Sequence, residues 1–456
     1  MYKSLRYFLL ALLPAAALMS CRKFVDIAPP RDQLSDEAVF TADGTALSAM
    51  AGAYAQIMRN HLSLGNAGLS VYTGLSADEI YHTSPNEDYD ALLNNAIASN
   101  QVGMLNDLWQ SSYQLIYHCT AILDGVERSS SLSTAVRDQL RGEAYFLRAY
   151  LYFHLTNLFG PVPLPLSKEY RSNALLPRSS VDSVYKQVER DLNEAIALLP
   201  PQINSRKTRP GRWAAKALLA RVYLYQEKWP LASAIATEVI QQGGFAMVPL
   251  TQVFGPSSRE TIWQLVSAIP AVNTSQGLLF VPVNASLVPG FSLTDDLWTS
   301  FSPADQRRAQ WLQTLTMNGT TYVYPFKYKL FSSTQGIEHN IVFRLTELLL
   351  IRSEARVHEQ ELTAALDDLN TVHLRAGLPV LSLTQPDALL EAIYQERRWE
   401  LFTEGGHRWF DLKRSARADA VLSALKGNHW QPTDALYPIP FRDLQTNVYL
   451  NQNPGY

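Results

Sequence analysis

The sequence predicts a mostly α protein in which helices pair and stack, with an irregular loop-rich part that contains small strands. Three observations support this. Apolar residues recur at three- and four-residue steps over long stretches, as they do on packed helices. Two adjacent helical segments carry small residues where they would cross. Between the helical stretches lie segments rich in Pro, Gly, Asn, Ser and Thr, where the helical period is lost.

The longest helical pattern runs from Leu140 to Leu158. Leu147, Leu151 and Leu155 form one apolar stripe, and further apolar residues form a second stripe beside it. A helix that is apolar over so much of its circumference is covered by neighbours on two sides. The pair Gly160-Pro161 then predicts its end.

The clearest helix pair spans 213–226 and 230–242. Ala220 with Tyr223, followed by Ala232 and Ala236, matches tetratricopeptide spacing, and small residues at these positions let two helices cross closely. Weaker or simpler helical patterns follow from Arg344 to Ala376, from Leu105 to Val126 and from Val181 to Leu199. We therefore expect tetratricopeptide-like stacked helix pairs, an α-α superhelix; unrelated helices in an irregular α domain are the alternative.

The predicted organisation is one body over 21–456, with helical repeats mainly in 36–245 and 340–415. The loop-rich part, mainly 62–95 and 249–335, includes β-type runs at Thr261–Val266 and Thr321–Tyr328. Long loops on a rigid scaffold often carry binding sites, so we expect the ligand there.

The N-terminus has the pattern of a lipoprotein signal. Lys3 and Arg6 precede an uncharged apolar run that is too short to cross a bilayer, and Leu18-Met19-Ser20 leads into Cys21. This arrangement resembles the bacterial lipobox, in which the cysteine is acylated and becomes the new N-terminus. Residues 1–20 are then a signal peptide and Cys21 the lipidation site, whereas the alternative is an ordinary signal peptide with a coincidental cysteine.

Composition excludes several classes of function. Lys+Arg 39 against Asp+Glu 42 leaves no basic excess, so nucleic acid is not expected as a partner. Only one cysteine, Cys119, remains beside Cys21, which excludes a disulfide framework and a cysteine metal site. No phosphate-binding glycine loop, nucleophile elbow or zinc helix is present, so we expect no enzyme, no metal and no cofactor.

A charged segment follows between Glu396 and Arg414. Glu404, Arg408 and Asp411 are spaced by four and three residues, so on one helix they would form a ladder of ion pairs. We interpret this ladder as a structural clamp rather than a ligand site.

Several segments together resemble the SusD/RagB family of outer-membrane nutrient-binding lipoproteins of Bacteroidetes. They begin at Cys21-Arg-Lys-Phe-Val-Asp and extend almost the whole length of the chain. The most specific are the segment from Glu396 to Arg414 and the tail, Tyr437-Pro-Ile-Pro with Asn451-Gln-Asn-Pro-Gly-Tyr. The others are Asn106-Asp-Leu-Trp, Arg141-Gly-Glu-Ala-Tyr-Phe-Leu-Arg, Phe159-Gly-Pro-Val-Pro and Ala214-Ala-Lys-Ala-Leu-Leu-Ala-Arg.

The resemblance implies a lipid-anchored protein of the outer membrane that faces the cell exterior and lies as a lid over a SusC-like TonB-dependent transporter. It implies capture of an oligosaccharide without chemistry and its transfer to the barrel. Peptide binding, as in RagB-type members, is the main alternative; a surface glycoside hydrolase and a pure scaffold are the others.

The family motifs are structural, so candidate ligand residues rest on composition alone. Tyr and Trp rings stack on sugars, although each ring can equally be a packing residue. The candidates, taken from the two loop-rich segments with two polar partners, are Tyr72, Asp78, Tyr81, Asn86, Tyr89, Trp298, Trp311, Tyr322 and Tyr324.

Overall fold

The computed structural model describes residues 36–456 apart from 333 and 335, so the predicted signal peptide and Cys21 lie outside the described residues. The first half is helical. Its elements are α2 (Asp36–Val39), α3 (Asp43–Ile57), α4 (Gly68–Ser76), α5 (Glu87–Leu93), α6 (Val102–Leu105), the π-turn η2 (Asn106–Gln110), α7 (Ser111–Arg128), α8 (Thr134–Phe159), α9 (Tyr170–Asn173), α10 (Val181–Leu198), α11 (Arg212–Tyr225) and α12 (Trp229–Gln242).

Short strands and helices occupy the middle of the chain, and helices return after it. The middle contains η3 (Leu250–Gln252), β2 (Thr261–Leu265), α13 (Ser275–Phe280), β3 (Phe291–Leu293), α14 (Asp295–Ser300), α15 (Gln306–Trp311), β4 (Leu312–Met317), β5 (Thr320–Pro325) and β6 (Asn340–Arg344). The last part contains α16 (Leu345–His358), α17 (Leu362–Arg375), α18 (Pro386–Leu401), α19 (His407–Arg414), α20 (Ala418–Lys426), η5 (Gly427–His429), η6 (Pro432–Ala435) and α21 (Phe441–Thr446).

The helix ends follow local chemistry. Ser180 caps α10 through a hydrogen bond that its Oγ accepts from the Ser183 amide at 3.2 Å, and Pro230 lies in the first turn of α12. Helix α8 stops at Gly160, whose φ of 72° is a backbone conformation that favours glycine. The predicted stop at this residue is confirmed.

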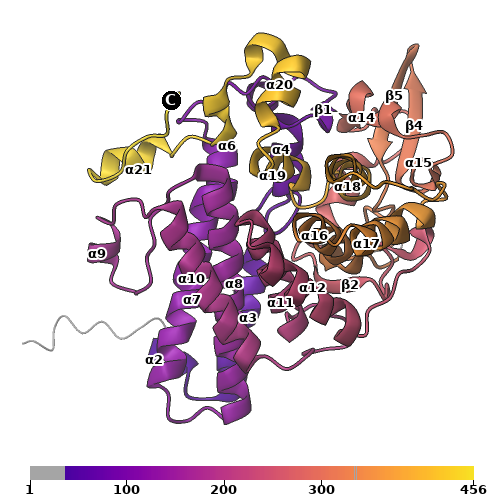
Figure 1. Cartoon of the computed structure of the whole chain (residues 1–456). Helices are drawn as coiled ribbons and strands as arrows, with labels where there is room; N and C mark the ends of the chain where they lie inside the picture. The colour runs from indigo at the N-terminus through magenta and orange to yellow at the C-terminus, as the bar shows by residue number, and fades with distance from the viewer. Residues whose placement is uncertain (1–35, 333, 335) are drawn as a thin grey trace, which may run out of the picture.

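Packing between helices is sequential. Helix α8 packs between α7 and α10, and the stack continues through α11 and α12 to α16 and α17 (Figure 1). Ala220, Ala232 and Ala236 are fully buried where α11 and α12 cross, as small residues at these positions predict. The predicted fold class, mostly α with stacked helix pairs and small strands, is confirmed.

Three two-stranded antiparallel ladders make up the strand content of the described residues: β1 (Ile80–His82) with β3, β2 with β6, and β4 with β5. The expected runs at 261–266 and 321–328 contain β2 and β5. The β4–β5 hairpin turns at Asn318-Gly319, where both residues have positive φ, and projects from the body in Figure 1.

One expectation about the loop-rich part is wrong. Residues 62–95 are not mainly loop, because they contain α4 and α5 as well as β1. Every residue of α4 is buried, since its Gly, Ser and Thr side chains are small enough to let neighbours pack on all sides. Helix α4 thus has an amino-acid composition that is typical of a loop, although it is a buried helix.

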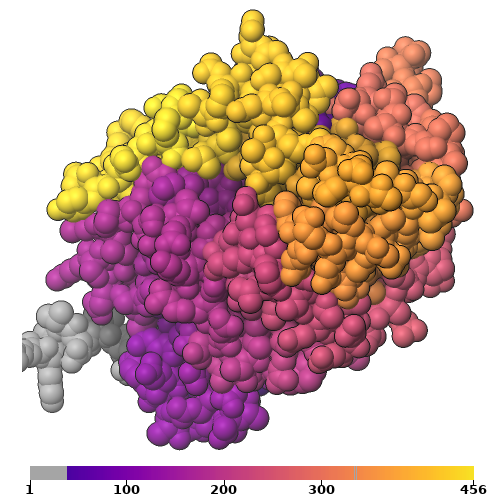
Figure 2. Space-filling model, viewed as in Figure 1, coloured from indigo at the N-terminus to yellow at the C-terminus, as the bar shows by residue number. Residues whose placement is uncertain are grey.

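The C-terminal segment closes the fold. Figure 2 shows it (yellow) lying against the helices of the first half, and hydrogen bonds join it to them. The amide of Tyr437 donates to the carbonyl of Leu158 at 2.8 Å, and Asn453 Nδ2 donates to the carbonyl of Phe159 at 3.0 Å. The tail is thus attached to the end of α8.

Candidate functional site

A surface groove lies beside the β1–β3 ladder, where the two predicted loop-rich segments meet. Strand β1 pairs with β3 from Ile80 opposite Leu293 to His82 opposite Phe291. The groove has a volume of about 350 Å³ and is called the β1–β3 groove below. Its lining residues are His82, Ser84, Pro85, Asn86, Tyr89, Leu278, Leu279, Val281, Pro282, Val283, Leu287, Val288, Gly290 and Phe291.

One side of the groove is polar and aromatic. Asn86 caps α5 by accepting a hydrogen bond from the Tyr89 amide at 3.0 Å, which fixes the start of this helix. The Tyr89 ring lies 5.2 Å from the Phe291 ring and 5.8 Å from the His82 ring, centroid to centroid. Both His82 nitrogens are engaged, Nδ1 with the Ser84 carbonyl at 2.7 Å and Nε2 with Asp90 at 2.9 Å. The side chains are therefore held in place before any ligand arrives.

The opposite side of the groove is aliphatic and comes from α13 and the segment that follows it up to β3. Val283 is 57% exposed and Leu287 is 53% exposed, so this wall is open to solvent. Thr83 joins the two sides, since its amide donates to the carbonyl of Gly290 at 3.2 Å and its hydroxyl to that of Pro289. A groove with one polar, aromatic side and one aliphatic side suits an amphipathic ligand.

Tyr89 is the natural hydrogen-bond donor of the groove. Burial, followed by the charges of Asp107 and Asp88, raises the pKa of its phenol. The phenol consequently stays neutral at physiological pH and keeps its proton for donation.

Of the nine predicted ligand residues, Asn86 and Tyr89 line the groove, and Tyr81 lies on β1 beside it. Since successive strand residues point to opposite faces, Tyr81 faces away from the side of His82. The sequence analysis did not predict His82 or the aliphatic wall as part of the site. The Val281-Pro-Val and Pro289-Gly patterns indicated a loop there, but not that its aliphatic side chains line a groove.

Four predicted ligand residues are interior, and the prediction of an accessible surface for them is wrong. Tyr72 is 3% exposed and donates to Asp107 at 2.7 Å, while Trp311 is buried and its Nε1 donates to the Leu250 carbonyl at 3.1 Å. Tyr324 is buried as well, and Asp78 is enclosed between two arginines. Aromatic composition cannot separate a ring that packs from a ring that stacks on a ligand.

The remaining two rings lie outside the groove. Trp298 is half-buried with the Arg308 guanidinium 4.2 Å from its ring centroid, and Tyr322 is half-buried opposite Leu315 on the β4–β5 hairpin. Neither lines the groove.

The predicted ladder of Glu404, Arg408 and Asp411 is wrong in its pairing. A turn at Gly405-Gly406, both with positive φ, separates α18 from α19, so Glu404 is not on the helix that carries Arg408. Each residue instead bonds another segment: Glu404 accepts from Arg344 at 2.8 Å, Arg408 donates to Asp78 at 2.7 Å, and Asp411 accepts from Arg397 at 2.8 Å.

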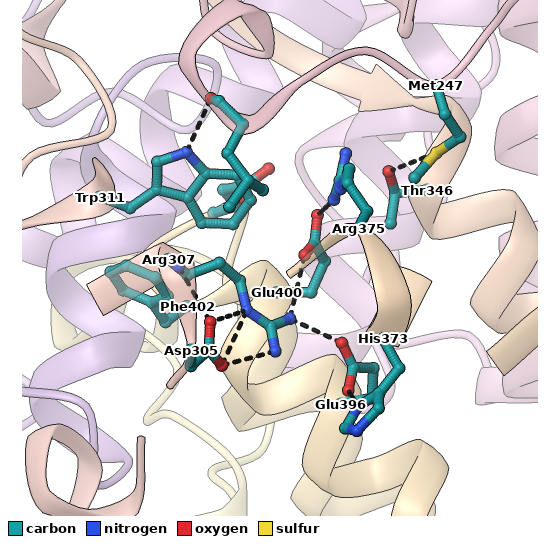
Figure 3. Close-up of polar contacts among 12 residues, drawn as sticks. Met247, Asp305, Arg307, Trp311, Thr346, His373, Arg375, Glu396, Glu400 and Phe402 are labelled. Atoms are coloured by element: carbon teal, nitrogen blue, oxygen red, sulfur yellow. Dashed lines mark hydrogen bonds and ion pairs between the residues drawn. The ribbon is translucent and has the colours of Figure 1, made fainter. Parts of the chain in front are cut away.

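A buried ionic cluster joins the loop-rich part to the helices that follow it. Figure 3 shows Arg307 of α15 between Asp305 and the carboxylates of α18. Arg307 donates to Asp305 at 2.8 Å, to Glu396 at 2.6 Å and to Glu400 at 3.1 Å. Buried ion pairs of this kind fix the relative position of elements more than they add stability.

Glu400 is the centre of this cluster. Burial alone would raise the pKa of its carboxyl, but the charges of Arg375, Arg344 and Arg307 lower it well below its ordinary value. Glu400 is therefore ionised throughout the physiological pH range, and it holds three arginines from different segments together.

The described residues contain no group of three or more His, Cys, Asp or Glu side chains placed to hold a metal ion. In the same part of the chain no helix is both long and apolar enough to cross a membrane.

The architecture of the chain is a helical stack that supports a loop-rich part with an open groove. Two family models match the chain: residues 23–224 match one described as "Starch-binding associating with outer membrane", and residues 294–456 match the SusD family. The chain belongs to the SusD/RagB family, an outer-membrane-associated family of nutrient-binding proteins.

Individual relatives and solved structures are similar to this chain over most of its length. SusD-like protein P25 of Formosa agariphila is 26% identical over 96% of this chain and 97% of its own length. A SusD superfamily protein from Bacteroides vulgatus superimposes with a TM-score of 0.81 at 19% identity, covering 91% of this chain and 99% of its own. A laminarin-binding SusD-like protein superimposes with a TM-score of 0.77 at 24% identity over 91% and 99% of the two chains.

Proposed function

We propose that this protein is a non-enzymatic surface lipoprotein that binds an oligosaccharide in the β1–β3 groove. The observation that carries this proposal is the groove itself, in which the Tyr89 ring and the Asn86 amide lie opposite an open aliphatic wall. A sugar presents C–H faces to rings and hydroxyls to amides and phenols, which is the chemistry that the polar, aromatic side of the groove offers. The laminarin-binding relative supports this cargo class.

The bound sugar would then pass to a SusC-like TonB-dependent transporter in the same membrane. An acylated Cys21 would hold the protein there, because several acyl chains anchor stably where one does not. The helical stack would contact the transporter while the loop-rich part holds the cargo.

The groove proposal is tested with Tyr89→Ala, using Tyr322→Ala as the matched control because Tyr322 is also half-buried but lies outside the groove. Affinity electrophoresis in gels that contain laminarin, starch, mannan or xylan identifies a retained polysaccharide. We expect Tyr89→Ala to weaken that retention about tenfold, the effect of losing one stacked ring, and Tyr322→Ala to leave it unchanged. Equal retention of both variants would refute binding in the groove.

A peptide is the second candidate cargo, because one wall of the groove is aliphatic. Val283→Ser with Leu287→Ser removes apolar area at exposed positions, where folding tolerates the change. A peptide ligand would lose affinity in this double variant, whereas a saccharide that stacks on Tyr89 would not.

Anchoring is tested with Cys21→Ala. We expect the wild-type protein in the outer-membrane fraction, labelled by fatty acid, and the variant without label. A wild-type protein that carries no fatty acid would contradict the proposed anchor.

A further inference from the structure

A second cavity lies on the helical part, away from the β1–β3 groove. It has a volume of about 370 Å³ and is bounded by α7, by the segment 163–174 that carries α9, and by the C-terminal segment 443–450. We call it the α7–α21 cavity. It shares no lining residue with the groove.

Two aromatic rings, each fixed by contacts within the protein, form the inner wall of the α7–α21 cavity. Trp109 and Tyr113 lie with their ring centroids 4.9 Å apart, and the Tyr113 hydroxyl donates to the carbonyl of Pro163 at 2.8 Å. Trp109 lies in the short π-helix η2 rather than in a regular α-helical turn. Such π-helical turns shift a side chain out of the regular helical register and are frequent at functional sites.

The rim of the cavity carries exposed rings. Tyr117 is 47% exposed and Tyr170 is 68% exposed. Among the residues that the structure describes, the aromatic side chains with comparable exposure are these two with Phe441 and Tyr449, and all four lie on α7, α9 or the tail around α21. Exposed aromatic rings gathered on one face indicate a recognition surface rather than scattered exposure.

A buried polar atom at the cavity lacks a partner. Thr120 lines the cavity and is 4% exposed, yet its Oγ1 has no hydrogen-bond partner among the described residues. A buried hydroxyl without a partner costs free energy, so it indicates a bound group that completes its hydrogen bonding.

The lining of the cavity is mostly apolar, and its polar groups are almost without charge. Asp443 is the one Asp, Glu, Lys, Arg or His among the described lining residues, and the other polar groups include the amides of Gln110 and Asn173. Burial raises the pKa of Asp443, although a hydrogen bond from Trp109 acts in the opposite direction. Such a site disfavours phosphate and other strongly charged ligands.

We propose that the α7–α21 cavity is a second saccharide site, which binds one or two neutral sugar units. The rings at the wall and rim would take the C–H faces of a pyranose, and the Thr120 hydroxyl with the amides would take its hydroxyls. A second site on one chain raises the avidity for a polysaccharide that reaches both sites. The inference stands independently of cargo binding in the β1–β3 groove.

The test uses Tyr117→Ala with Tyr170→Ala, and Tyr449→Ala as the matched control, because Tyr449 is an exposed ring on the same surface that does not line the cavity. All variants also carry Tyr89→Ala, which removes the groove contribution. The probes are methyl pyranosides of glucose, galactose, mannose and xylose together with maltose, cellobiose and laminaribiose. Saturation-transfer NMR and the fluorescence of Trp109 report binding.

We expect at least one probe to bind the Tyr89→Ala protein, to lose about tenfold or more in affinity with the two cavity substitutions, and to bind normally with Tyr449→Ala. No binding of any probe, or binding that the cavity substitutions leave unchanged, overturns the proposal. Loss of a protein partner from the cavity variants with sugar binding intact also overturns it, in favour of a protein interface.

Thr120→Val separates a ligand role from a structural one. Valine has the same shape and removes the unpartnered hydroxyl, so the melting temperature should stay equal or rise. We expect saccharide affinity to fall nonetheless. An unchanged affinity in the stable Thr120→Val protein would contradict the assigned role of the hydroxyl.

Discussion

Lys413 carries an ammonium group that is buried without a carboxylate partner among the described residues. Its ammonium donates to the carbonyl of Asn157 and lies 5.4 Å from the Trp409 ring centroid, and no carboxylate lies within ion-pair distance among the described residues. Burial lowers the pKa of Lys413 from its ordinary 10.5 to about 7.

This shift predicts a pH dependence of stability. In the unfolded chain Lys413 keeps its ordinary pKa, so between pH 7 and 10.5 the unfolded state binds more protons and the folded state gains relative stability as pH rises. The penalty for burying the charge is therefore full below pH 7. Lys413→Met should stabilise the protein by about 1–3 kcal/mol at pH 6, with a smaller gain at pH 9.

Urea unfolding of wild type and variant at pH 6 and pH 9 measures this difference. Lys186→Met, at an exposed lysine, is the control and should change stability by less than about 0.5 kcal/mol at either pH. A gain from Lys413→Met that is independent of pH would show that the ammonium is not the cause.

Residue identity predicted only part of the groove lining. Asn86 and Tyr89 were predicted as a polar partner and a ring in the first loop-rich segment, and they line the groove. Tyr72 and Trp311 could not be excluded from the sequence, because their burial depends on α4 and on the Leu250 carbonyl, which are placed by distant packing.

At the scale of elements, the helices with strong periods and clear end signals were predictable. The patterns for α11 and α12 matched within one residue, and the end of α8 was predicted because Gly160 and Pro161 mark it, although α8 begins six residues before the predicted start at Leu140. Helix α4 was missed because it is buried on all sides and has no amphipathic period. The Glu404 ladder failed because two glycines turn the chain between α18 and α19.

The buried ionic cluster predicts that the stability of the fold depends on the contacts between Arg344 and the carboxylates at the end of α18. Arg344 donates to Glu400 at 2.6 Å and to Glu404 at 2.8 Å, so Arg344→Met leaves two buried carboxylates short of a partner. We expect a loss of about 3–5 kcal/mol in the free energy of unfolding.

The matched control is Arg417→Met, which breaks the exposed pair of Arg417 with Glu391 at 2.7 Å. That change should cost less than about 1 kcal/mol in the same urea titration. Similar costs for the two arginines would mean that burial of the cluster does not determine its contribution.

At the scale of the whole molecule, the tail joins the C-terminal part of the chain to the helical stack of the first half. Asn453 is buried and donates to the carbonyls of Phe159 and Tyr437 at 3.0 and 2.8 Å, and it accepts from Arg178. The last residues are therefore part of the core contacts of the helical stack.

Asn453→Ala should cost about 2–3 kcal/mol, because it leaves buried hydrogen-bonding groups without partners. Thermal unfolding measures the loss, and Asn428→Ala is the control at an exposed asparagine for which the structure shows no side-chain bond. An equally small shift for both variants would mean that water replaces the bonds of Asn453.

The pairing of Ile80 with Leu293 has a consequence for biogenesis. The two walls of the groove are made from chain segments with all of α7 to α12 between them, so closing this ladder carries the slow kinetics of distant pairing. While the polypeptide is still emerging, the helices can form locally, but the β1–β3 groove cannot form until residue 293 has been delivered. A chain that ended before this point would contain folded helices but no groove.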